Sequence, residues 1–297
     1  MRPPTYEFGD PLSFGGADAD RPAFEAARVV ILPVPLDRTT TFVPGTRNGP
    51  REILQASSHV ELWDEELGVD IHRIGIFTLP EMELPFGEQE AALREIGRVA
   101  GELLACGKFL VTLGGEHSIT PPIVAAAAAR HAGLSVLQID AHADLRDSYM
   151  GSPYNHACAM RRVLEHAPCT QVAVRSLSAE EAAAAAVLPT RIFYDWSLRS
   201  SPDWVDRVVE TLGEKVYVTI DCDGLDPAIM PAVGTPEPGG LTWQEVLRLL
   251  KAVFERREVV AFDLVELCPI PGLTAPNYLC ARLVYKLLTY RFALRPA

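Results

Sequence analysis

Short runs of β-branched and other apolar residues recur along the chain, and most are apolar at successive rather than alternate positions. This pattern is typical of strands that are covered on both faces. The predicted strands are Val29–Val34, Phe109–Leu113, Val136–Asp140, Gln171–Val174, Ile192–Tyr194, Val216–Asp221, Val259–Asp263 and a less regular run at Arg73–Phe77.

Between these runs lie segments whose apolar residues recur at helical spacing. The predicted helices are Glu88–Ala105, Pro121–His131, Asn155–Glu165, Asp203–Leu212, Thr242–Arg256 and Tyr278–Tyr290. Capping-box patterns begin at Ser178 and Thr242. Because strands and helices alternate, the sequence predicts an α/β fold, with a parallel sheet between two layers of helices. In such sheets the chemistry gathers just beyond the carboxyl ends of the strands.

Composition agrees with one large folded unit. The 297 residues are 48% hydrophobic and 22% charged, a composition that excludes a predominantly disordered chain. We find no linker or composition shift, so residues 1–297 are predicted to form a single domain. Residues 1–28 are predicted to be an N-terminal extension that packs on the core or on a neighbouring subunit.

The net charge and the cysteine content limit the kinds of molecule that the protein is expected to bind and the cellular compartment in which it is expected to work. With 27 basic against 39 acidic residues, the formal net charge of −12 disfavours nucleic acid and anionic lipid surfaces and mildly favours a cationic ligand. The six cysteines form no CxxC pair, as expected of reduced thiols. No signal peptide is apparent, and no apolar run approaches the ~20 residues that span a bilayer. We therefore expect a cytoplasmic protein without membrane contact.

Acidic residues and histidines follow three of the predicted strands. The segments are Gly114-Gly-Glu-His117, Asp140-Ala-His142-Ala-Asp144 and Asp221-Cys-Asp223-Gly-Leu-Asp226. An aspartate at a strand end also caps helices and turns, and each segment alone fits that interpretation equally well. Together they favour a shared site. Residues two apart on an extended strand end point the same way, which would align Asp140 with His142 and Asp221 with Asp223.

Four carboxylates in one pocket need a counter-charge, since they cannot all stay ionised at close range. Two divalent cations balance Asp140, Asp144, Asp221 and Asp223, and His117 and His142 supply one neutral imidazole to each ion. Ligand sets dominated by oxygen favour Mn²⁺ over zinc. Cys222 is predicted to face the opposite side of its strand and to belong to the core.

These motifs resemble those of the ureohydrolases, the arginase and agmatinase family. The resemblance rests on GGEHS at 114–118, DAHAD at 140–144 and DCDGLDP at 221–227, in that order. Further similar segments are VPLDRTTTFVPGTRNGPREI at 34–53, AVGTPEPGG at 232–240 and DLVELCP at 263–269. The resemblance covers nearly the whole chain. It implies a three-layer α/β/α fold around a mostly parallel sheet of about eight strands, assembled as homo-trimers or hexamers.

The resemblance also implies residue roles. One Mn²⁺ would be bound by His117 and Asp144, and the other by His142 and Asp223. Asp140 and Asp221 would bridge the two ions.

Two further positions match family residues that act on the substrate. His156 matches the proton-carrying histidine beside the substrate, and Glu266 matches the carboxylate that accepts hydrogen bonds from the guanidinium. Alone, His156 fits a surface or capping histidine and Glu266 an ordinary loop acid. In the implied reaction the metals lower the pKa of water from about 15.7 towards neutrality. Asp144 would relay a proton to the departing amine, and the products would be urea and a primary amine.

The segment after DAHAD separates the branches of the family. Arginases have an asparagine two residues after this motif, where this chain has Arg146. The leading interpretation is therefore an agmatinase that converts agmatine to putrescine and urea. Alternatives are hydrolysis of aminopropylagmatine, of guanidinobutyrate or another guanidino acid, of arginine, or of formiminoglutamate. A single-zinc relative of the deacetylases and a metal-binding scaffold without turnover remain alternatives of a different class.

Overall fold

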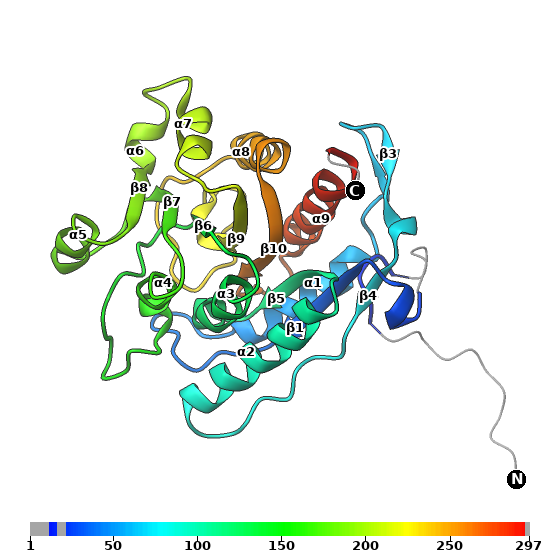
Figure 1. Cartoon of the computed structure of the whole chain (residues 1–297), viewed down its shortest axis with the longest axis horizontal. Coiled ribbons are helices and arrows are strands. Elements are labelled where there is room, and N and C mark those ends of the chain that lie inside the picture. The colour runs from blue at the N-terminus through cyan, green and yellow to red at the C-terminus, as the bar shows by residue number, and fades with distance from the viewer. Residues whose placement is uncertain (1–11, 17–21, 295–297) are drawn as a thin grey trace, which may run out of the picture.

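A parallel sheet of eight strands forms the centre of the protein (Figure 1). We describe residues 12–16 and 22–294 of a computed structural model. The strand order is β4-β1-β5-β10-β9-β6-β7-β8, and every neighbouring pair is parallel. The strands are β1 Val29–Val34, β4 Ile76–Thr78, β5 Phe109–Gly114, β6 Leu134–Ile139, β7 Cys169–Val174, β8 Thr190–Tyr194, β9 Lys215–Asp221 and β10 Glu258–Val265. The strands β2 Trp63–Asp64 and β3 Val69–Asp70 form a separate antiparallel pair.

Helices cover both faces of the sheet. They are α1 Gly49–Ser57, α2 Gln89–Ala105, α3 Thr120–Ala128, α4 Ala159–Val163, α5 Ala179–Ala185, α6 Asp195–Leu198, α7 Trp204–Glu210, α8 Trp243–Arg256 and α9 Ala275–Thr289. Buried residues of α1, α7, α8 and α9 pack on one face, and those of α2, α3 and α4 pack on the other. Helices α5 and α8 begin with the two predicted capping boxes, at Ser178 and Thr242.

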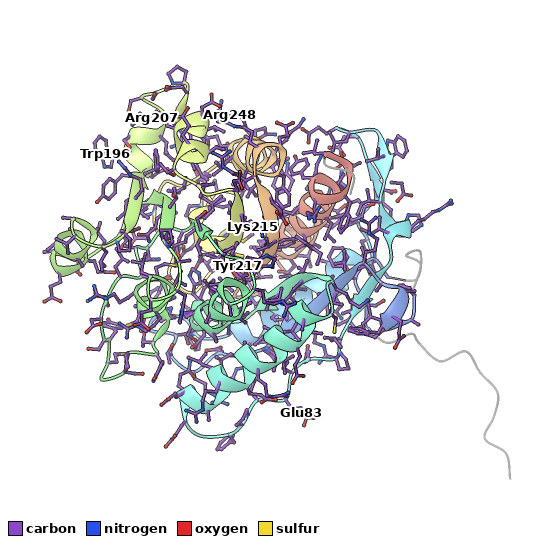
Figure 2. The ribbon with its side chains drawn as sticks, in the orientation of Figure 1. Glu83, Trp196, Arg207, Lys215, Tyr217 and Arg248 are labelled. Carbon is purple, nitrogen blue, oxygen red and sulfur yellow. The ribbon has the colours of Figure 1, made fainter. Side chains whose placement is uncertain are left out.

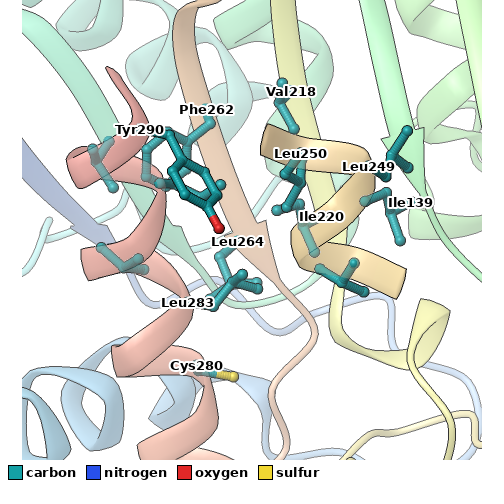
Figure 3. Close-up of a cluster of buried hydrophobic side chains, with 14 of the residues drawn as sticks. Ile139, Val218, Ile220, Leu249, Leu250, Phe262, Leu264, Cys280, Leu283 and Tyr290 are labelled. Atoms are coloured by element: carbon teal, nitrogen blue, oxygen red, sulfur yellow. The ribbon is translucent and has the colours of Figure 1, made fainter. Parts of the chain in front are cut away.

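Side chains of the central strands alternate between two apolar layers. Figure 3 shows Val218 and Ile220 of β9 and Phe262 and Leu264 of β10 beneath helices α8 and α9. Tyr217 of β9 belongs to the apolar layer on the opposite face and is fully buried, and Figure 2 labels it near the centre of the view. Burying both faces of the inner strands requires apolar residues at successive positions, which is the pattern in the sequence.

The predicted three-layer α/β fold with a parallel eight-stranded sheet is confirmed. Two predicted elements were wrong in part. The predicted strand Arg73–Phe77 begins too early, because His72–Ile74 form a 3-10 turn and β4 starts at Ile76. The predicted helix Asn155–Glu165 is a 3-10 turn at His156–Cys158 followed by the short α4, because the Asn155 side chain accepts the Ala157 N–H and begins a tight turn instead.

Most of the predicted N-terminal extension, residues 1–11 and 17–21, lies outside the described residues. Within it, Phe14 belongs to the buried apolar cluster that includes residues of α1 and β4, and its N–H donates to Thr78 Oγ1 at 3.0 Å. Among the described residues, no helix has both the length and the apolar character needed to cross a membrane.

Candidate metal centre

Six acidic and histidine side chains meet at the carboxyl edge of the sheet. His117 follows β5, and Asp140, His142 and Asp144 follow β6. Asp221 ends β9, and Asp223 lies in the 3-10 turn Cys222–Gly224 directly after it. Three segments that are distant in sequence meet here because β9 pairs with β6, and β10 joins β9 to β5.

The first group surrounds the buried His117 ring. His117 Nδ1 lies 3.1 Å from Asp140 Oδ2, 3.2 Å from Asp144 Oδ2 and 3.4 Å from Asp221 Oδ2. Each of these residues is at most 7% exposed. Three carboxylate oxygens therefore converge on one imidazole nitrogen inside the protein.

A second group shares Asp140 with the first. His142 Nδ1 lies 2.9 Å from Asp223 Oδ2 and 3.6 Å from Asp140 Oδ1. Asp140 thus presents one oxygen to each imidazole. Two sets of side chains have ligand atoms close enough to hold an ion, namely His117, Asp140 and Asp221, and Asp140, His142 and Asp223.

Local backbone conformation aims these carboxylates differently from the prediction. The predicted alignment of Asp221 with Asp223 on an extended strand end is wrong, because the chain turns after Asp221 and its Oδ1 accepts the Asp223 N–H at 2.8 Å. Asp144 reaches the cluster with a left-handed φ of 51°. Gly224 permits the close approach of the two loops, since a Cβ there would lie 2.7 Å from Asp140 N.

The His117 ring is oriented by groups on β9 and β10. Its Nε2 lies 2.9 Å from Thr219 Oγ1, which donates its proton to Asp263 Oδ1 at 2.5 Å. The hydroxyl oxygen therefore accepts from Nε2–H, and the Nδ1 lone pair faces the carboxylates. His117 Nδ1 is buried and has no hydrogen-bond partner among the described residues. A buried imidazole nitrogen without a partner, surrounded by carboxylates, is what a divalent cation requires, so these residues fit a metal site.

Without a cation, the cluster must hold protons. Burial and the nearby Asp140 raise the pKa of Asp144 to about 6, and burial and the charge of Asp223 raise that of Asp221 well above its usual range. Burial lowers the pKa of His142, but the charges and hydrogen bonds of Asp223 and Asp140 outweigh it and raise the pKa to about 12. Cations would replace these protons, as positive charge at the site lowers the pKa of each ligand.

Glu266 and His156 lie beside the cluster. Glu266 is 4% exposed, has a left-handed φ of 63°, and accepts the His117 backbone N–H through Oε1 at 2.7 Å. The same oxygen lies 3.3 Å from His156 Nδ1. Burial lowers the pKa of His156, but its hydrogen bond to Glu266 and the charges of Glu266 and Asp144 outweigh burial and raise the pKa to about 9. His156 is therefore protonated at neutral pH.

A loop that the sequence analysis did not assign to the site holds His156 in place. Thr39 Oγ1 accepts the His156 N–H at 2.9 Å, and Thr41 Oγ1 lies 3.3 Å from His156 Nε2. The buried Glu116 organises this loop by accepting from Arg38 N and Thr39 N, both at 2.6 Å. The only sequence signal for these residues was their place within the 34–53 and 114–118 motifs.

All eight predicted site residues thus come to one place, and five of them line a cavity of 140 Å³. The cavity is lined by Thr41, His142, Asp144, Arg146, Tyr149, His156, Ala157, Asp221, Asp223 and Thr235. Cys222 points away from it, as predicted, and its Sγ lies 3.6 Å from Cys280 Sγ in the core. Asp226 stays outside the cluster, since its Oδ1 accepts the Ala228 N–H at 2.8 Å in a turn.

Comparison with known proteins agrees with this geometry. Residues 27–289 match the Arginase family. The chain is 41% identical to an N(1)-aminopropylagmatine ureohydrolase of Thermus thermophilus over 92% of both chains. It is 37% identical to an enzyme of the same name from Synechocystis sp., over 98% of this chain and 97% of that one. The crystal structure of an agmatine ureohydrolase of Thermoplasma volcanium superposes with a TM-score of 0.84, at 32% identity over 93% of both chains. Since the match spans nearly the entire described chain, this protein belongs to the arginase family of hydrolases.

Proposed function

We propose that this chain cleaves the guanidino group of agmatine and releases urea and putrescine. The observation that carries the proposal is the pair of carboxylate and imidazole groups that share Asp140, placed beside Glu266 and His156 at one cavity. The names of the relatives support the same chemistry, since each of those reported above is a ureohydrolase.

The proposed metal ligands are the six residues of the cluster. We assign His117 and Asp144 to one Mn²⁺, His142 and Asp223 to the other, and Asp140 and Asp221 to both. The four carboxylates match the charge of two divalent cations, and the excess of oxygen ligands favours manganese. Bound there, such a pair supplies a water of lowered pKa and neutralises negative charge.

Glu266 is assigned to hold the guanidinium. A guanidinium is a planar donor that matches the two oxygens of a carboxylate, and Glu266 is buried beside His156, which lines the cavity. Its backbone is fixed by the hydrogen bond from Glu266 N–H to Gly115 O at 2.7 Å. Substrate bound to Glu266 would lie beside both His156 and Asp144.

His156 and Asp144 are assigned to the proton transfers. Hydrolysis requires a proton to reach the departing amine, and an acid of suitable pKa within reach supplies it. Asp144 faces the cavity, so it would take a proton from the attacking water and pass it to the amine. His156, which lies beside Glu266, would then donate its own proton so that the amine leaves as an ammonium, and would regain a proton from solvent.

Aminopropylagmatine is the second candidate substrate. The relatives from Synechocystis sp. and Thermus thermophilus, which match 98% and 92% of this chain, carry that name. Arginine is less well matched, since the position where arginases carry an asparagine holds Arg146, whose Nε lies 3.6 Å from Glu181. Guanidino acids and formiminoglutamate remain further alternatives with the same metal chemistry.

We also propose the setting in which the enzyme works. The family resemblance supports a homo-trimer or hexamer, and the reduced cysteines and the kind of reaction support the cytoplasm. The product of agmatine cleavage is a diamine, so the reaction belongs with polyamine synthesis.

The test is a urea assay after loading with Mn²⁺, using agmatine, aminopropylagmatine, arginine and 4-guanidinobutyrate. We expect the highest kcat/KM with one of the two amines. Asp223→Asn should abolish turnover and reduce metal content, whereas Asp226→Asn, which removes a carboxylate of the same motif outside the cluster, should retain both. Absence of urea from all four substrates in a protein that holds two manganese ions per chain would refute the proposal.

A further inference from the structure

One half-buried carboxylate, beside the cavity-lining His142, accepts no hydrogen bond from the described residues. Glu237 lies two residues after Thr235, which lines the cavity, and its side chain is 36% exposed. Its nearest charged neighbour is His142, with Glu237 Oε1 at 4.0 Å from His142 Nε2. Among the described residues, nothing donates a hydrogen bond to this carboxylate. A carboxylate in this state is available to a cationic ligand.

The backbone at Glu237 is held firmly relative to the metal cluster. Arg175 Nη2 donates to the carbonyl of Glu237 at 3.1 Å and to that of Asp223 at 2.6 Å. Thr235 Oγ1 donates to Asp223 Oδ2 at 3.1 Å. These bonds tie the loop that carries Glu237 to a proposed metal ligand, so the backbone from which the carboxylate extends is fixed before a ligand binds.

Glu237 lies on the solvent side of the cluster. His142 Nδ1 faces Asp223 and Asp140, and Nε2, on the other side of the same ring, faces Glu237. A substrate whose guanidinium is bound deep in the cavity must extend its other end towards solvent. The tail therefore passes the side of the site where Glu237 lies.

The other charged groups at this mouth are already paired. Arg146 Nε lies 3.6 Å from Glu181 Oε2, and its guanidinium carbon stacks 4.7 Å from the centroid of the Tyr149 ring. Asp147 accepts a hydrogen bond from Arg162 at 2.6 Å. Glu237 differs from them, since its only ion-pair neighbour among the described residues is His142, at 4.0 Å, and its side chain accepts no hydrogen bond from them.

We propose that Glu237 binds the ammonium at the far end of the substrate and selects guanidines with a cationic tail over those with a carboxylate tail. This inference rests on the proposed function. Agmatine and aminopropylagmatine both carry a protonated nitrogen four methylene groups from the guanidine, so one carboxylate serves either substrate. A carboxylate in the same position repels the tail of a guanidino acid, and specificity comes from both effects.

A different role for Glu237 would be to orient His142 as a metal ligand. The separation of 4.0 Å is too long for a hydrogen bond, which is the reason for preferring the role in selectivity. The two roles predict different results. Substitution of a residue that orients His142 would lower metal content and would impair the hydrolysis of every substrate equally. Substitution of a residue that binds the tail would impair the hydrolysis only of substrates with a cationic tail.

The experiment compares Glu237→Gln with the parent enzyme loaded with Mn²⁺. The substrates are agmatine and pentylguanidine, in which a methyl group replaces the ammonium. We expect the variant to raise KM for agmatine about fivefold to tenfold, with kcat and metal content little changed, and to leave kinetics on pentylguanidine unaltered. Glu237→Lys should instead improve kcat/KM for 4-guanidinobutyrate.

Glu102→Gln is the matched control. It removes one negative charge from the exposed face of α2, where Glu102 pairs with Arg98 at 2.6 Å, and should change neither KM. Equal losses on agmatine and pentylguanidine, or a loss of manganese, would overturn the assignment of Glu237 and leave the proposed function standing. If the parent enzyme released no urea from any guanidine, the proposed function itself would fail.

Discussion

Replacing Thr219 with valine tests whether the orientation of His117 sets the affinity of the metal centre. The substitution keeps the side-chain shape but removes the hydroxyl between His117 Nε2 and Asp263 Oδ1, at 2.9 and 2.5 Å. Both partners are fully buried, so each loses a hydrogen bond that water cannot replace. Loss of a group that orients a metal-binding histidine lowers affinity about 10- to 100-fold, which corresponds to about 1.4–2.7 kcal/mol.

The same change should destabilise the metal-free protein. A buried donor or acceptor left without a partner costs about 1–3 kcal/mol, and Asp263 keeps two donors, Thr120 and Tyr217, so we expect the lower half of that range. Urea denaturation of the chelator-treated protein measures this loss. Manganese titration followed by calorimetry measures the affinity.

Thr112 offers a matched control on the adjacent part of the sheet. It lies on β5, is equally buried, and its hydroxyl has no hydrogen-bond partner among the described residues. Thr112→Val should therefore leave stability unchanged or slightly higher, with normal metal affinity, and Thr219→Ser should retain most of the affinity because it keeps the hydroxyl. Equal manganese affinity in Thr219→Val and Thr112→Val would refute the reasoning.

Further predictions concern proton transfer, the metals and a buried ion pair. His156→Asn should lower kcat about 10²- to 10⁴-fold with manganese content retained, and unchanged turnover would remove His156 from the mechanism. Chelation should lower the melting temperature, and manganese binding at pH 7 should release at least one proton, because the pKa of about 12 keeps His142 protonated until a cation binds. Calorimetry in buffers of different ionisation enthalpy detects this release, and a buffer-independent heat would contradict it. Lys286→Met should destabilise the protein by about 3–5 kcal/mol in urea denaturation, because it leaves the buried Asp64, 2.9 Å from Lys286 Nζ, without a counter-charge. Burial raises the pKa of Glu66, but hydrogen bonds from two lysines and a tyrosine outweigh it and lower the pKa to about 2. The resulting stability, about 1–2 kcal/mol after allowance for solvent screening, is fully present above pH 4.5 and is lost as the pH falls towards 2. Glu66→Gln should reduce this acid dependence, and an identical pH profile would show that Glu66 does not contribute to it.

Hydrophobic patterning was sufficient to predict the architecture because every inner strand is buried on both faces. The runs that begin at Val29 and Phe109 match β1 and β5 to within one residue. The order of the strands could not be predicted from this pattern, because the apolar residues of a buried strand do not indicate which strands pair with it. The antiparallel pair β2 and β3 was also missed, because two-residue strands have no periodicity.

The sequence predicted which residues form the candidate site, because carboxylates and imidazoles can be recognised as metal ligands by residue type alone. Carboxylates and imidazoles at strand ends indicated the cluster, but the reason given for the alignment of Asp221 and Asp223 did not hold. A 3-10 turn and the positive φ of Asp144 aim these groups, and neither has a clear signature in the residues themselves. Thr219, Glu116 and Arg175 act through hydrogen bonds to distant segments, so only the folded structure reveals them.

The strand order has a consequence for how the centre forms during synthesis. Strands β5 and β6 follow one another in the chain but never pair, because β10 and β9 lie between them. A nascent chain that ends before residue 215 therefore holds two unconnected groups of strands, with His117 on one and Asp140 on the other. These residues become neighbours only when the last third of the polypeptide inserts into the gap. We therefore expect metal capture to be a late event in folding, and the long sequence separation of these pairings predicts slow formation of the sheet.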